Sequence, residues 1–219
     1  MDPKHLLDGL VTYVCFLPIL TFHEFAHAWV AWKCGDDTAR LQGRVSLNPA
    51  VHMDLVGTVI LPLVAVFLAA SDSRLAGFII GWGKPVPVDL GNLRHRRRDD
   101  TLVALAGPMM NVLLALALLA VLRAANLFQV EAMDEVLLRV AMLSLFLCFF
   151  NLLPIPPLDG SHALKNLIGM RDETYFRYSQ FGFFLVILAI QIPLVNQFMV
   201  AATFGTLQVM AAILGFPRA

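Results

Sequence analysis

Two histidines and a glutamate lie close together in the run Thr21-Phe22-His23-Glu24-Phe25-Ala26-His27-Ala28. His23 and His27 are four residues apart, so on a helix their side chains lie on one face, one turn apart. This spacing lets both imidazoles bind a single zinc ion, and Glu24, beside the first of them, can polarise a water molecule at that ion. The pattern therefore predicts a zinc centre that activates water.

The residues around this pattern are apolar. Residues 6–32 form a hydrophobic segment long enough to cross a membrane, and it contains Glu24 and both histidines near its far end. Ionisable groups at membrane depth are costly, and they mark functional sites by default. An alternative is a helix whose histidines only form hydrogen bonds to neighbours, but a glutamate in the same turn favours the zinc site.

The composition is that of a membrane protein with several spans. Of the 219 residues, 58% are hydrophobic, and the 16 Lys and Arg balance the 16 Asp and Glu. The mean hydropathy is +0.73. A zero net charge gives no indication of nucleic-acid binding. The three cysteines, Cys15, Cys34 and Cys148, are too far apart to predict a disulfide framework or a cysteine-rich metal site. The first apolar segment is not expected to be a cleaved signal peptide, because it carries the candidate ligands.

The distribution of apolar runs predicts an all-α polytopic membrane protein with about five or six transmembrane helices and a short membrane-associated strand or loop. The expected spans lie at residues 6–32, 55–70, 101–122 and 136–153. The runs at about 179–195 and about 198–216 are either one broken pair of helices or one span plus a surface helix, with the break at Pro193 and Asn196. Residues 81–88, Gly81-Trp82-Gly83-Lys84-Pro85-Val86-Pro87-Val88, contain too much Gly and Pro for a regular helix and predict the strand or loop. We expect one domain over residues 1–219.

Basic residues predict which side of the membrane each loop faces. The run from Arg94 to Arg98 is expected to be cytoplasmic, because cytoplasmic loops are enriched in Lys and Arg. The loops at residues 33–53 and 161–177 are also basic. All three can be cytoplasmic only if residues 54–83 cross the membrane an even number of times, as a hairpin or a re-entrant segment, rather than as a single span.

Two histidines need a third protein ligand if one position of the zinc ion is to stay open. Asp159 is the best candidate, because it follows a proline-broken helix end at which the backbone can turn back toward the membrane interior. Local sequence alone favours an ordinary Asp-Gly turn at this position. His52 and His162 are alternative third ligands, and His162 is three residues from Asp159.

Two motifs together resemble the site-2 protease family of intramembrane zinc metalloproteases. They are His23-Glu24-Phe25-Ala26-His27 and the run Asn151-Leu152-Leu153-Pro154-Ile155-Pro156-Pro157-Leu158-Asp159-Gly160. Ala106-Gly107-Pro108-Met109-Met110-Asn111 is similar to a small-residue motif of that family, and Gly81-Trp82-Gly83 is similar to its Gly-x-Gly strand. The resemblance covers about residues 10–165, with further helices at about 178–216, and it shows no PDZ or CBS domain.

The resemblance implies roles for individual residues. One zinc ion per chain would be bound by His23, His27 and Asp159, Glu24 would be the general base, and Asn151 would orient or stabilise the substrate carbonyl. Gly81, Trp82, Gly83 and Lys84 would contact an extended substrate. The expected activity is hydrolysis of peptide bonds within or next to the transmembrane segments of membrane proteins, in the lipid bilayer of a prokaryotic cell (inner) membrane.

Two other functions fit parts of the sequence. A zinc-binding scaffold without proteolytic activity would need the ligands but not Glu24. A metal transporter would need several acidic or histidine groups along a path through the membrane, whereas here they converge on one point. The substrate, the oligomeric state and any partner that delivers the substrate cannot be inferred from the sequence.

Overall fold

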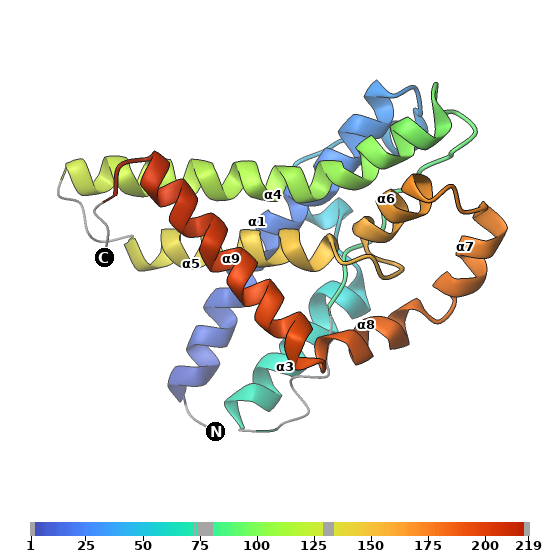
Figure 1. Cartoon of the computed structure of the whole chain (residues 1–219). Coiled ribbons are helices and arrows are strands. Elements are labelled where there is room, and N and C mark those ends of the chain that lie inside the picture. Colours follow the sequence, from blue (N-terminus) through green and yellow to red (C-terminus); the bar gives the residue numbers. More distant parts are fainter. Residues whose placement is uncertain (1–2, 72, 74–80, 129–133, 217–219) are drawn as a thin grey trace. The chain divides into compact units, whose positions relative to one another are not determined.

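The computed structural model describes residues 3–71, 73, 81–128 and 134–216. The chain divides into two compact units, residues 1–99 and residues 100–219, and each is described by itself. The first unit contains α1 (Pro3–Lys33), α2 (Thr38–Leu41), the short 3-10 turn η1 (Pro49–Val51), the π-helical turn η2 (Leu55–Ile60) and α3 (Leu61–Ala70). Figure 1 shows these elements in blue to cyan colours.

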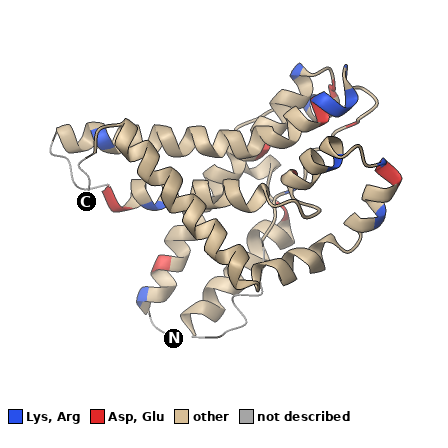
Figure 2. Cartoon of the chain, in the orientation of Figure 1, with Lys and Arg blue, Asp and Glu red and all other residues tan. Residues whose placement is uncertain are grey.

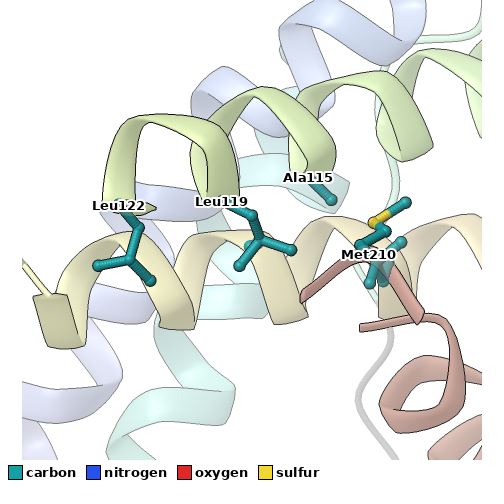
Figure 3. Close-up of a cluster of buried hydrophobic side chains, with 6 residues drawn as sticks. Ala115, Leu119, Leu122 and Met210 are labelled. Carbon is teal, nitrogen blue, oxygen red and sulfur yellow. The ribbon is translucent and has the colours of Figure 1, made fainter. Parts of the chain in front are cut away.

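The second unit is built from longer helices and from a chain of short ones. They are α4 (Arg96–Leu127), whose first residues belong to the first unit, α5 (Asp134–Asn151), α6 (Asp159–Leu167), α7 (Asp172–Ser179), α8 (Gly182–Ile190) and α9 (Pro193–Ile213). Six buried side chains of α4, α5 and α9 form its apolar core (Figure 3): Ala115, Leu119, Leu122, Ala141, Leu145 and Met210. The Ser144 hydroxyl of α5 also donates to the Asn111 carbonyl of α4, at 2.9 Å.

Within the described ranges, α1, α4 and α9 are long and apolar enough to cross a membrane. Figure 2 shows that the middle of α4 carries no charged residue. Three such helices are fewer than the five or six predicted. The apolar run at 55–70 forms only the short helical stretch of η2 and α3, and the run at 179–195 ends α8 at Ile190 before Pro193 begins α9. Helix α5 carries Asp134, Glu135 and Arg139 within its 18 residues.

The described part of the chain contains no assigned strand, so the predicted strand at residues 81–88 is not confirmed as a regular one. These residues lie outside the helices and form hydrogen bonds to the connector between α1 and α3. The question of a hairpin or a single span at residues 54–83 depends on residues 74–80, which lie outside the described residues.

In the first unit, α3 packs along α1. The contact is close at Gly9 of α1, where a Cβ atom would lie 2.7 Å from a methyl group of Val66. The connector that follows α1 also folds back on it, since α2 and η1 both contact α1. The far end of α1, which carries the histidine pair, is therefore the better covered end: its buried residues begin at Ile19.

A buried carboxylate fixes the end of α1 to residues 89–94. Asp36 is fully buried and accepts hydrogen bonds from the backbone and hydroxyl of Thr38, from the Asn92 side chain at 3.2 Å and from the Asp89 amide at 2.8 Å. The Arg94 amide donates to the Cys34 carbonyl at 3.1 Å. Burial alone would raise the pKa of Asp36, but these hydrogen bonds outweigh it and leave the pKa below its ordinary value.

We predict that Asp36→Asn destabilises the first unit by about 2 kcal/mol at pH 7, because buried donors lose their charged acceptor. A lowered folded-state pKa means that the carboxylate contributes stability above the unfolded pKa, about 3.9, and that this contribution is lost as the pH falls through the folded-state pKa. Thermal unfolding in detergent at several pH values measures this contribution. The difference in stability between wild type and Asp36→Asn should become smaller below about pH 4.

Asp37, the exposed neighbour of Asp36, provides the control for this measurement. Asp37→Asn removes only a surface ion pair with Arg40, at 3.4 Å, and is expected to change stability little at any pH. If the difference in stability between wild type and Asp36→Asn were the same at pH 7 and pH 3, the stabilising role of the Asp36 carboxylate would be contradicted.

Candidate metal centre and substrate-contacting segment

The two histidines of α1 face each other inside the first unit. His23 and His27 are both buried, their Nε2 atoms are 3.0 Å apart, and their rings meet edge to face with centroids 4.6 Å apart. Two imidazole nitrogens that bind one zinc ion tetrahedrally, each at about 2.0–2.1 Å, lie about 3.3 Å from each other. The pair therefore fits two ligand positions of a zinc ion after a small ring adjustment.

Glu24 lies against the Gly-Trp-Gly segment. Its carboxylate is half-buried, and a Cβ atom built on Gly83 would lie 3.1 Å from Glu24 Oε1 and 2.9 Å from a methyl group of Leu20. Only glycine fits this position without displacing α1 side chains. The structure thus brings together His23, Glu24, His27 and the predicted substrate-contacting segment, although some 50 residues separate them in the sequence.

One edge of this segment is occupied by the connector. Trp82 donates from its amide to the Gly57 carbonyl at 3.0 Å, and its carbonyl accepts from the Thr58 hydroxyl at 2.7 Å. The Lys84 amide donates to the His52 carbonyl at 2.8 Å. Trp82 and Lys84 therefore direct their backbone groups to the same side.

Asn151 and Asp159 belong to the second unit, at the two ends of the proline-containing turn between α5 and α6. Asn151 ends α5 and donates to the Leu147 carbonyl of its own helix at 3.0 Å. Asp159 begins α6 and is half-buried. A Cβ atom on Gly160 would lie 2.2 Å from the Leu152 carbonyl oxygen, so this turn closes only with glycine after Asp159.

Comparison with known proteins decides the family. The model of Peptidase family M50 matches residues 11–133 and 125–192, which is well over half of the chain. The chain belongs to peptidase family M50. This confirms the predicted site-2 protease membership.

Curated relatives agree with this assignment. The chain is 35% identical over 201 residues to "Putative zinc metalloprotease YwhC" of Bacillus subtilis, a match that covers 88% of this chain and 84% of the relative. It is 30% identical over 183 residues to "Putative zinc metalloprotease Rip2" of Mycolicibacterium smegmatis, covering 83% of this chain and 67% of the relative. No solved structure matches significantly. The family and these names support the predicted zinc metalloprotease, and the apolar helices support an integral membrane protein.

The two alternative ligands of this M50 chain have other partners. His52 is fully buried and its Nε2 atom lies 2.7 Å from the Ser46 carbonyl oxygen. His162 lies in α6 with its Nδ1 atom 3.3 Å from an Asp100 carboxylate oxygen. Lys165 of the same helix is buried and forms ion pairs with Asp100 at 2.8 Å and Asp172 at 3.1 Å, which fix α6 to α4 and α7.

One buried residue beside the site, Arg44, was not predicted from the sequence. Arg44 is only 4% exposed, and its guanidinium donates to the Lys84 carbonyl and, at 3.2 Å, to the Pro85 carbonyl. Burial lowers the pKa of Arg44 from its ordinary value, and the nearby charge of Glu24 counteracts part of this effect. From the sequence, Arg44 could only be counted among the basic residues of a cytoplasmic loop.

The contact between Glu24 and Gly83 gives a direct prediction. Gly83→Ala should leave bound zinc unchanged but lower proteolytic activity by about tenfold or more, because the new methyl group displaces the Glu24 carboxylate. Gly205→Ala in α9, where a Cβ atom would have no neighbour within 4 Å, is the matched control. Zinc content and cleavage rate are measured on the same preparations, and full activity in Gly83→Ala would contradict the contact.

Proposed function

We propose that this chain is an intramembrane zinc endopeptidase that cleaves peptide bonds within or next to transmembrane segments of membrane-protein substrates. The observation that carries the proposal is the arrangement in the first unit. A half-buried glutamate lies against Gly83, and it follows directly on one of two buried, facing imidazoles at one end of an apolar helix.

Within this proposal, His23, His27 and Asp159 bind one zinc ion per chain. Two neutral nitrogens and one carboxylate are a typical catalytic donor set, because three protein ligands leave a position open. The rigid turn around Gly160 would hold Asp159 at the start of α6, and the ion pairs of Lys165 would hold α6 within its own unit. When bound, zinc supplies a Lewis acid that polarises a carbonyl and acidifies water.

The chain's own residues then perform the proton transfers. Glu24 takes a proton from the attacking water and delivers it to the leaving amine. Asn151 retains an amide hydrogen beyond the one given to Leu147, and we propose that it donates to the oxyanion, a contact of a type worth about 3 kcal/mol. The apolar surroundings strengthen both interactions, because they exclude water.

The same proposal assigns substrate contact to Gly81, Trp82, Gly83 and Lys84. An extended substrate would pair with the edge that Gly83 presents, in the manner of a strand added to a sheet edge. The substrate is a membrane protein in a lipid bilayer. The bacterial relatives favour a multi-pass protein of a prokaryotic cell membrane. We propose that the Arg94–Arg98 run lies on the cytoplasmic side, because cytoplasmic loops are enriched in Lys and Arg.

Glu24→Gln tests the activity. The variant should keep its zinc and lose at least about a hundredfold of its cleavage rate, because the amide cannot accept the water proton. Purified protein is reconstituted with a panel of tagged single-span membrane proteins, and fragments are detected by mass spectrometry. Equal cleavage by wild type and variant would contradict the proposal, as would no cleavage together with zinc uptake into vesicles by both proteins.

Asp159→Ala tests the third ligand. We expect wild type to bind one zinc ion per chain and the variant to bind much less in metal analysis after dialysis, since a two-histidine site is incomplete. Glu173→Ala, an exposed acidic residue of the same unit, is the control and should retain zinc. Full zinc retention in Asp159→Ala would assign the third position to another residue.

A further inference from the structure

The backbone of residues 82–84 uses its two edges differently. In extended chain, the N–H and C=O groups of alternate residues point to opposite edges. The N–H and C=O groups of Trp82 and Lys84 face the connector. Those of Trp82 form hydrogen bonds with Gly57 and Thr58, and those of Lys84 with His52 and Arg44. The N–H and C=O of Gly83, the residue between them, have no hydrogen-bond partner among the described residues.

This open edge is short. Pro85 and Pro87 have no N–H to donate, and the Pro85 carbonyl is already an acceptor for Arg44 at 3.2 Å. Gly83 is also the residue at which a Cβ atom would lie 3.1 Å from Glu24 Oε1. A substrate that pairs there would therefore have its backbone fixed next to the general base, and a shift by one residue would remove that alignment.

Arg44 is the only charged group that holds this segment among the described residues. Its guanidinium bridges two successive carbonyls, of Lys84 and Pro85, from a position that is 96% buried. Its Nε atom is buried without a hydrogen-bond partner. A buried guanidinium is costly unless its donors are used. Both hydrogen bonds come from Nη2 while the buried Nε–H has none, so the two carbonyls are the groups that hold Arg44 in this position.

We propose that Arg44 is a positioning residue for substrate: it clamps the carbonyls of Lys84 and Pro85 so that only the Gly83 edge is offered, in one register relative to Glu24. This inference rests on the proposed function. It assigns Arg44 no contact with the reacting atoms. Its effect is on where the substrate backbone lies, and so on which bond is cleaved.

The test compares Arg44→Met, Arg44→Lys and the control Arg40→Met in the full chain. Arg40 lies on the same connector and is exposed, and its guanidinium lies over the Trp32 ring and pairs with Asp37. Amide hydrogen exchange over residues 81–88 reports the clamp without any need for activity. Bound zinc, KM, kcat and the cleaved bond are then measured on a tagged single-span peptide with an alanine- and leucine-rich transmembrane segment interrupted by Gly-Pro.

For Arg44→Met we expect faster exchange at Trp82 and Lys84, normal zinc, a KM raised about tenfold or more with a smaller change in kcat, and cleavage spread over neighbouring bonds. Arg44→Lys should be intermediate, because an ammonium can replace the single Nη2 donor but its N–H groups are not fixed in direction as those of the planar guanidinium are. Arg40→Met should match wild type in every measurement.

Other outcomes overturn the inference. Unchanged exchange over residues 81–88, or an unchanged KM and cleaved bond in Arg44→Met, would show that Arg44 does not set the register. Loss of zinc with faster exchange throughout the first unit would show a structural role alone. If zinc-loaded wild type cleaves nothing, the proposed function fails, and the exchange data still decide whether Arg44 holds the segment.

Discussion

The cost of placing polar groups in an apolar helix governs this structure. His23, Glu24 and His27 lie in a membrane-length segment, where a polar side chain in contact with lipid would cost several kcal/mol. In the first unit, the connector and residues 81–94 pack onto the end of α1 that carries these three residues. Buried polar groups then recur in the covering layer itself. Asp36 and Arg44 are each more than nine-tenths buried, and backbone amides or carbonyls are among the partners of both.

The connector is therefore a functional part of the first unit and not only a spacer between spans. Asp54 begins η2 by accepting from the amides of Val56 and Gly57, which leaves the Gly57 carbonyl directed at Trp82. Gly57 also leaves room for the indole, since a Cβ atom there would lie 2.4 Å from the Trp82 ring. Residues that the sequence places before the Gly-Trp-Gly segment thus supply the hydrogen-bonding partners that a neighbouring strand would otherwise provide.

The sequence was sufficient to predict the family and the zinc-metalloprotease class, because residue type and spacing carry that information locally. The interval between His23 and His27 places both on one helix face, and the structure has them facing at 3.0 Å. In the part of the chain that the structure describes, fewer helices than predicted are long and apolar enough to cross a membrane, since hydropathy alone does not show that α8 ends at Ile190 or that 55–70 begins with a π-helical turn. The closeness of Gly83 to Glu24 and the hydrogen bonds of Arg44 could not be predicted, because both depend on chain segments that meet only after folding, 40 or more residues apart.

The shortness of the edge at Gly83 has a consequence for substrate choice. If a substrate pairs there as proposed, it gains about two backbone hydrogen bonds, each worth about 1 kcal/mol net. Unwinding a turn of a transmembrane helix exposes several backbone groups, at a cost of several kcal/mol each in hydrocarbon. Pairing on this scale cannot offset that cost, so the enzyme would select mainly for helices that are already weak. Glycine, proline or a polar residue near the cleaved bond would then matter more than any particular side chain beside it.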